Sequence, residues 1–216
     1  MKKGAIFDMD GLMFDTERLW QDGWRKLARE NGYEPSEDFS KEIMGTSGEV
    51  MYAVIHKHYP EVEPESFAGA CRKMVADALK KEVPIKPGLF DILDFFRERN
   101  VKMAVASSSQ QQMIRGNLKK AGMEDYFSVV LSSTEVAQPK PAPDVFLEAA
   151  KRLGLDAADC YVLEDSFGGV RAGAAAGAAV VMIPDQLAPT QTIAGLCAGV
   201  YEDLAAAAKA IADEAI

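Results

Sequence analysis

The feature that most constrains the fold is an alternation of short apolar runs with longer helical stretches. The runs are rich in branched residues, as strands buried on both faces of a sheet should be. They cover residues 4–8, 102–106, 127–131, 160–164 and 179–183. The helical stretches cover residues 88–99, 110–121, 143–153 and 168–176. Because strands that alternate with helices form parallel sheets with helices on both faces, we predict an α/β protein with a doubly wound parallel sheet.

Residues 16–82 break this alternation, because they contain no convincing strand. The first helical stretch carries Trp20, Trp24, Leu27 and Ala28 on one face. Three more helical stretches follow, at residues 36–44, 48–58 and 65–81. We predict an α-helical domain of residues 16–82, inserted into an α/β core of residues 1–15 and 83–216.

The composition suits a folded globular protein and argues against several classes of partner. The apolar fraction of 48% is that of a packed globular core, and the formal charge of −9 argues against a nucleic-acid surface. No segment approaches the length of a membrane span, and the N-terminus lacks the pattern of a signal peptide. The three cysteines are far apart, which is typical of buried free thiols in a reducing compartment. We therefore expect a cytoplasmic monomer that binds neither nucleic acid nor membranes.

Polar side chains follow four of the five predicted strands at or just beyond the point where each strand ends. In a parallel α/β sheet, these ends share one edge, and ligands bind there. The side chains concerned are Asp8, Asp10, Ser107, Ser108, Lys140, Glu164 and Asp165. Their carboxylates, hydroxyls and ammonium group predict a site for magnesium and phosphate.

The chemistry of these groups supports that prediction. Magnesium is usually held by a few carboxylates together with waters and substrate phosphate, and a lysine supplies a point charge to phosphate. With one carboxylate oxygen on the metal, the other oxygen of Asp8 can attack phosphorus and form an aspartyl phosphate. Asp10, two residues further on, can protonate the leaving oxygen and later activate water. The candidate metal ligands are Asp8, Asp10, Glu164 and Asp165, and the candidate phosphate ligands are Ser107, Ser108 and Lys140.

Four motifs in this order resemble those of the haloacid dehalogenase superfamily, within the branch of β-phosphoglucomutase and the small sugar-phosphate phosphatases. The motifs are FDMDG (7–11), VASSS (105–109), PKPAPD (139–144) and LEDS (163–166), and the resemblance spans nearly the whole chain. The chain departs from the usual pattern in two places. Relatives usually have a small residue where Pro139 stands, and a proline-containing turn where this chain has FGG at 167–169.

The resemblance implies a function for each motif. Asp8 would be the nucleophile and Asp10 the acid/base. Phosphate would be bound by Ser107 and Lys140, and magnesium would be placed by Glu164 and Asp165. Residues 16–82 would form the helical cap of this branch. The dehalogenases lack the second aspartate and need no metal, so Asp10 indicates phosphoryl transfer instead.

Each motif also has a simpler structural explanation. The explanations are a solvated strand end for Asp8 and Asp10, an exposed loop for Lys140, a capping box for Ser109 with Gln112, and a helix start for Glu164 with Asp165. Four motifs that fall in order at successive strand ends favour one active site over four coincidences.

We expect a magnesium-dependent phosphatase that hydrolyses a small phosphorylated metabolite, such as a sugar phosphate, through an aspartyl phosphate. One alternative is a phosphomutase of the β-phosphoglucomutase type, which returns the phosphoryl group to its substrate. A second alternative is a phosphorylatable receiver module. A receiver would be about half this length, and residues 16–82 would have no role in it.

Two positions in the inserted helical domain favour the phosphatase over the mutase. The β-phosphoglucomutases carry a histidine and an arginine, which grip the second phosphate, at positions that match Trp20 and Gly48 of this chain. Without those cations, we expect the aspartyl phosphate to be left to water. The sequence does not name the substrate, and we expect the loop around Gly45, Thr46 and Ser47 to contribute to specificity.

Overall fold

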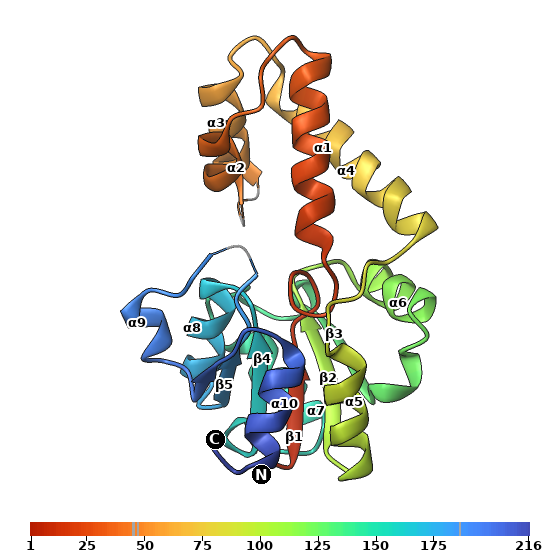
Figure 1. The fold of residues 1–216 in the computed structure, drawn as a ribbon, viewed down its shortest axis with the longest axis vertical. Coiled ribbons are helices and arrows are strands. Elements are labelled where there is room, and N and C mark those ends of the chain that lie inside the picture. The colour runs from red at the N-terminus through yellow and green to blue at the C-terminus, as the bar shows by residue number, and fades with distance from the viewer. Residues whose placement is uncertain (45, 47, 186) are drawn as a thin grey trace. The chain divides into compact units, whose positions relative to one another are not determined.

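The computed structural model describes residues 1–44, 46, 48–185 and 187–216. The chain folds into two compact units (Figure 1). One unit, here the α/β unit, consists of Met1–Phe14 and Ile85–Ile216. The other, here the helical unit, consists of Asp15–Pro84. Both chain crossings between the units fall within two residues of the predicted domain boundaries.

The α/β unit is built on a parallel sheet in the order β3-β2-β1-β4-β5-β6. The strands are β1 (Gly4–Phe7), β2 (Lys102–Ser107), β3 (Val129–Ser132), β4 (Cys160–Glu164), β5 (Ala179–Met182) and β6 (Gly199–Val200). Phe7 at the end of β1 pairs with Val105 of β2 and Leu163 of β4. Asp8, one residue beyond, therefore lies level with Ala106 and Glu164.

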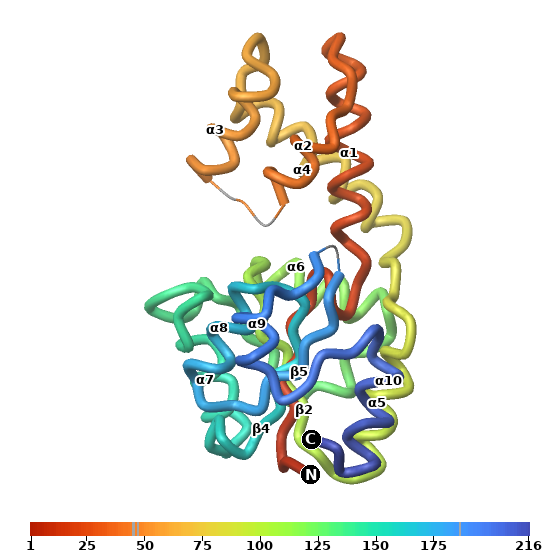
Figure 2. Tube along the Cα trace, turned by 60° about the vertical axis from the view of Figure 1, so that its left-hand side comes forward, coloured from red at the N-terminus to blue at the C-terminus, as the bar shows by residue number. Residues whose placement is uncertain are grey.

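Helices cover both faces of this sheet (Figure 2). They are α5 (Leu89–Glu98), α6 (Gln111–Lys120), α7 (Asp144–Arg152), α8 (Phe167–Ala175), α9 (Gln191–Ala194) and α10 (Leu204–Ala212). On one face, Phe96 of α5 packs against the rings of Phe7 and Tyr161. On the other, Phe146 of α7 and Val170 of α8 belong to one buried core. This confirms the predicted doubly wound architecture.

The helical unit contains α1 (Thr16–Glu30), α2 (Glu37–Ile43), α3 (Gly48–His58) and α4 (Pro64–Lys81). Its core is aromatic: Trp24 stacks on Phe67 at 5.8 Å between ring centroids and meets Phe39 edge-on at 6.0 Å. Trp24 and Leu27 are buried as predicted, whereas Trp20 is half-buried. Burial of one aromatic stripe explains why four amphipathic helices form a unit of their own.

Some details differ from the prediction. The sheet gains a sixth strand, β6, whose two residues are too few to leave a periodic pattern in the sequence. The sequence places Leu204, Ala208, Ile211 and Ala215 on one face of a C-terminal helix. Helix α10 ends at Ala212, however, so Ala215 lies beyond it and is exposed. Of the three cysteines, Cys71 and Cys160 are buried, but Cys197 is only half-buried.

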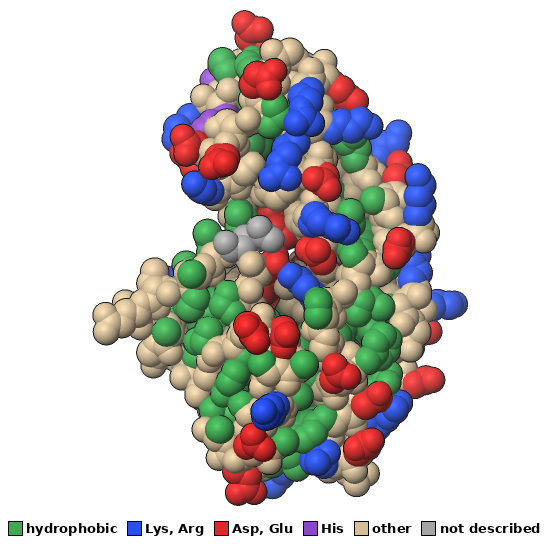
Figure 3. Space-filling model, viewed as in Figure 1, with side chains coloured by type: hydrophobic (Ala, Val, Ile, Leu, Met, Phe, Trp, Pro, Cys, Tyr) green, Lys and Arg blue, Asp and Glu red, His purple; other side chains and the backbone are tan. Residues whose placement is uncertain are grey.

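The surface carries charges of both signs. On the face drawn in Figure 3, Lys and Arg side chains are interspersed with Asp and Glu side chains. Among the residues that the structure describes, no helix has the length and apolar character needed to cross a membrane.

Gly173 allows α8 to lie close to the sheet. A Cβ atom placed on Gly173 would lie 2.9 Å from methyl carbons of both Val162 on β4 and Val180 on β5. Both contacts are with β-branched side chains, which have little rotamer freedom. Close approach of α8 to the sheet therefore requires glycine at this position.

We predict opposite effects for two glycine-to-alanine substitutions in helices. Gly173→Ala should lower the free energy of unfolding by about 1–3 kcal/mol, because the added methyl group overpacks the core. Gly116→Ala in α6 meets nothing within 4 Å and should raise it by up to about 1 kcal/mol, because alanine favours helix. Urea denaturation of both variants beside the parent measures the two changes. Equal effects would contradict the close packing of α8.

Candidate active site

Asp8 begins the site at the centre of the sheet. All four residues of β1 are buried, and the next backbone N–H, that of Asp8, donates to the carbonyl oxygen of Leu163 at 3.0 Å. The residue is only 7% exposed. Asp8 is therefore an extension of a buried strand, and the solvated strand end considered for it is wrong.

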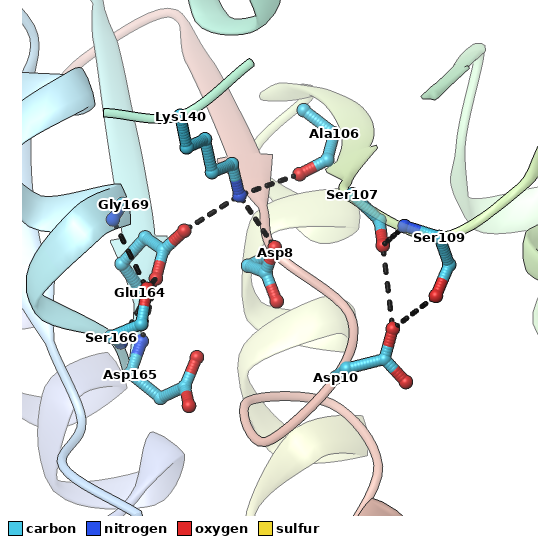
Figure 4. A network of polar contacts seen from close by, with 10 residues as sticks. All are labelled: Asp8, Asp10, Ala106, Ser107, Ser109, Lys140, Glu164, Asp165, Ser166 and Gly169. Carbon is cyan, nitrogen blue, oxygen red and sulfur yellow. Dashed lines mark hydrogen bonds and ion pairs between the residues drawn. The ribbon is translucent and has the colours of Figure 1, made fainter. Parts of the chain in front are cut away.

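Lys140 joins Asp8 to Glu164 (Figure 4). Its Nζ atom donates to Asp8 Oδ1 at 2.5 Å, to Glu164 Oε1 at 2.7 Å and to the carbonyl oxygen of Ala106 at 3.1 Å. These three contacts match the three N–H donors of an ammonium group. The side chain of Lys140 is 7% exposed, so the exposed loop considered for it is also wrong.

Glu164 is fully buried, and both of its carboxylate oxygens are engaged. Oε1 accepts from Lys140, while Oε2 accepts from the backbone N–H groups of Asp165 and Ser166 and from Ser166 Oγ, at 2.9–3.1 Å. A Cβ atom on Gly169 would lie 1.7 Å from Oε1, so only glycine leaves room for this carboxylate. The residue that caps α8 is Ser166, whose Oγ accepts from Gly169 N–H.

Asp10 turns toward Ser107 at the end of β2 and Ser109 just beyond it (Figure 4). Its Oδ2 atom accepts from Ser109 Oγ at 2.6 Å, and Ser107 Oγ lies at 3.4 Å. Ser107 is 1% exposed, whereas Ser108 is exposed and lies outside the network drawn in Figure 4. The proposed capping box is wrong, because the residue that precedes α6 is Gln110.

Gly11 lets the Asp165 carboxylate lie against the turn that follows β1. The backbone of Gly11 has φ of +87°, and a Cβ atom there would lie 2.2 Å from Asp165 Oδ2. Any other residue would suffer both backbone strain and a collision with this carboxylate. The glycine of FDMDG is thus explained by the approach of Asp165 and the turn geometry.

The crowding of carboxylates shifts their ionisation. Burial raises the pKa of Asp8 to about 7, with Glu164 and Asp10 adding to the rise against the opposing Lys140. Burial also raises the pKa of Asp165 well above its ordinary value, and the charges of Glu164 and Asp8 contribute. Burial alone would lower the pKa of Lys140, but the two carboxylates outweigh it and raise that pKa. In the folded protein, negative charge on Asp8 and on Asp165 is therefore unfavourable in the absence of a cation.

The donor set fits a hard divalent cation. No cluster of three or more Asp, Glu, His or Cys side chains that suits a metal ion is found among the described residues. Magnesium, however, needs only one or two protein carboxylates when waters and substrate phosphate complete its shell. Asp8 and Asp165 are two oxygen-donating groups whose raised pKa values a cation would reverse.

The predicted residues do not all occupy equivalent places. Asp8, Lys140 and Glu164 are joined directly, and Asp165 lies beside them. Glu164 uses both of its oxygens within the protein, and the side chain of Asp10 is held by hydroxyl groups. These contacts make Asp8 and Asp165 the better candidates for side-chain metal ligands.

The sequence did not predict two hydrogen bonds of the site. The hydroxyl of Ser109 binds Asp10, and the hydroxyl of Ser166 binds Glu164. Both serines stand within recognised motifs, but a serine near a helix start is explained equally well as a cap. Only the rotamers in the folded chain show which carboxylate each hydroxyl reaches.

Comparison with known proteins identifies similar chains. Residues 5–183 match the family described as haloacid dehalogenase-like hydrolases. A phosphorylated carbohydrates phosphatase from Thermotoga maritima is 30% identical over 180 residues, which cover 81% of this chain and 82% of that protein. A bifunctional riboflavin kinase/FMN phosphatase from Arabidopsis thaliana is 33% identical over 87% of this chain, which spans only 49% of that longer protein.

A solved structure extends the similarity to the fold. A family hydrolase from Deinococcus radiodurans, crystallised with bound phosphate and sodium, superposes with a TM-score of 0.84 at 25% identity. The match covers 99% of this chain and 96% of that one. Both units of this chain thus have counterparts in a single known architecture.

We predict that Asp8→Asn stabilises the metal-free protein at alkaline pH. Because the pKa of Asp8 is about 7 in the folded state and about 4 when unfolded, its contribution to stability is fully present below pH 4 and is lost as the pH rises through 7. In EDTA, the variant should exceed the parent by a few kcal/mol at pH 8 and by much less at pH 5. Denaturation at both pH values measures the difference.

Saturating magnesium provides the control for this experiment. The cation should remove the advantage of Asp8→Asn at pH 8, because it stabilises the ionised carboxylate of the parent. An advantage that does not depend on pH would show that the raised pKa of Asp8 is wrong.

Proposed function

This chain belongs to the haloacid dehalogenase-like hydrolases, and from that premise we propose that it hydrolyses a small phosphorylated metabolite with the help of magnesium. Its relatives include named phosphatases, and the chain is an enzyme of the phosphoric monoester hydrolase type. The receiver module considered above is therefore excluded. A monomeric enzyme of the cytoplasm is part of the same proposal.

The observation that carries the proposal is the buried Asp8–Lys140–Glu164 chain at the carboxyl ends of β1 and β4. In the proposed reaction, a carboxylate oxygen of Asp8 attacks the phosphorus of the ester. A phosphorus–oxygen bond of Asp8 forms as the ester bond to the leaving oxygen breaks. Lys140 neutralises Asp8 before attack and faces the charge that develops on the phosphoryl oxygens.

Asp10 carries out the proton transfers of both steps. It gives a proton to the leaving oxygen, so that the product departs as an alcohol. In the second step, water attacks the aspartyl phosphate and Asp10 takes a proton from it, releasing inorganic phosphate and restoring Asp8. Ser107, which is buried at the end of β2, would donate its hydroxyl to the phosphate, and the exposed Ser108 would contribute at most its backbone N–H.

Asp8 and Asp165 are the side chains that would hold the magnesium ion. When bound, the ion supplies positive charge that keeps Asp8 ionised and offsets the charge of the phosphoryl group. Glu164 would act indirectly, because its carboxylate holds the Lys140 ammonium group and the backbone at the start of α8.

We propose further that the helical unit acts as a cap that determines the substrate. The specificity loop expected around Gly45, Thr46 and Ser47 lies largely outside the described residues, because only Thr46 of the three is described. A sugar phosphate is the favoured substrate class, since one relative is named for phosphorylated carbohydrates. Another relative is named as an FMN phosphatase, so the alcohol part of the substrate has to be identified by experiment.

We predict that the protein releases phosphate from at least one member of a panel of sugar phosphates, nucleotides and p-nitrophenyl phosphate. Turnover should require magnesium and be lost with EDTA. Asp8→Asn should abolish it, because an amide does not attack phosphorus, while its circular dichroism matches the parent. A folded variant with near-parental turnover would disprove the assignment of the nucleophile.

We predict hydrolysis rather than isomerisation of a hexose phosphate. Trp20 and Gly48 offer no cation to a second phosphate, so water should reach the aspartyl phosphate first. The test supplies β-glucose 1-phosphate with a trace of the 1,6-bisphosphate and follows glucose 6-phosphate and inorganic phosphate together. Rapid formation of glucose 6-phosphate with little phosphate release would instead identify a mutase.

A further inference from the structure

A short hydrogen bond to the Asp10 carboxylate comes from a residue to which the reaction above gives no role. Ser109 Oγ donates to Asp10 Oδ2 at 2.6 Å. The two residues are 99 positions apart in the sequence, and they meet because β1 and β2 are neighbours in the sheet. A hydrogen bond of this length to a carboxylate is among the stronger kinds in proteins.

The hydroxyl groups of Ser107 and Ser109 make different contacts with Asp10. A hydroxyl group has one proton to donate. Ser107 Oγ lies 3.4 Å from Asp10 Oδ2, and it accepts the backbone N–H of Ser109 at 3.0 Å. If Ser107 gives its proton to a bound phosphate, its long contact with Asp10 is lost, whereas the bond from Ser109 is retained.

The backbone of Ser109 is held on both sides. Its N–H donates to Ser107 Oγ, and its carbonyl oxygen accepts from Ser132 Oγ at 2.7 Å. Asp10 in turn stands on a tight turn in which Gly11 N–H donates to the carbonyl oxygen of Phe14 at 2.9 Å. The backbone at both ends of the Ser109–Asp10 bond is therefore held by hydrogen bonds within the protein before any substrate arrives.

We propose that Ser109 is a positioning residue that holds the Asp10 carboxyl group in place for proton transfer. The inference rests on the proposed function, because it assigns Ser109 to the acid/base of that reaction. With its carboxyl group held at Oδ2 by Ser109, Asp10 is oriented to pass a proton to the leaving oxygen. In the second step, the same carboxyl group receives a proton from the attacking water.

A comparison of leaving groups tests this role with Ser109→Ala. A sugar alkoxide needs a proton as it departs, whereas p-nitrophenolate does not. For the sugar phosphate that the parent hydrolyses fastest, kcat/KM should fall by about 10–100-fold. For p-nitrophenyl phosphate, kcat/KM should fall by less than about threefold, because the first step then needs no acid. Ser109→Thr, which keeps the hydroxyl, should restore the loss.

A double-mutant cycle separates action through Asp10 from an independent effect. In the Asp10→Asn background, Ser109→Ala should cause no further loss for the sugar phosphate. Ser128→Ala is the matched control, since that hydroxyl donates to the Met103 carbonyl oxygen at 3.3 Å, at the opposite end of the sheet. It should leave both substrates unaffected.

Three results would overturn the inference. The first is an equal loss of kcat/KM on the two substrates, and the second is a loss of kcat/KM that multiplies with that of Asp10→Asn. The third is a rise in KM with kcat unchanged, which would make Ser109 a substrate ligand. A parent protein that releases phosphate from no ester would instead overturn the proposed function, so the two failures are distinguishable.

Discussion

The site depends on the two ion pairs that the Lys140 ammonium group makes. This group lies between Asp8 and Glu164, all three side chains being nearly or fully buried, and it neutralises one of two negative charges. Removal of one member of a buried ion pair typically costs several kcal/mol, because the remaining charge has no counterpart. Without Lys140, the carboxyl ends of β1 and β4 would repel one another at the centre of the sheet.

Two glycines leave the space that the charged side chains of the site need. Gly11 leaves space for Asp165, and Gly169 leaves space for Glu164. In both places the neighbouring atom is a carboxylate oxygen, and that of Glu164 accepts from the Lys140 ammonium group. At both places a Cβ atom would collide with a carboxylate. The site therefore requires these glycines as well as the acidic residues.

The sequence predicted the sheet and the strand ends well for physical reasons that are local. Buried parallel strands are short and apolar, and their carboxyl ends share one edge, so the order of residues along the chain was enough to place Asp8, Lys140 and Glu164 together. The contacts of Ser109 and Ser166 could not be predicted, because capping a helix and binding a carboxylate need the same hydroxyl. The strand β6 was missed because two residues show no periodicity.

The order of the strands has a consequence for how the enzyme is made. The strand β1, at the centre, pairs with β2 and β4, and the bond from Lys140 to Asp8 spans 132 residues. A ribosome delivers these parts one after another, so Asp8 leaves it long before its counter-charge does. Contacts so distant along the chain form late and slowly. The buried site therefore forms only after most of the chain has been made, when Lys140 and the carboxyl end of β4 have reached Asp8.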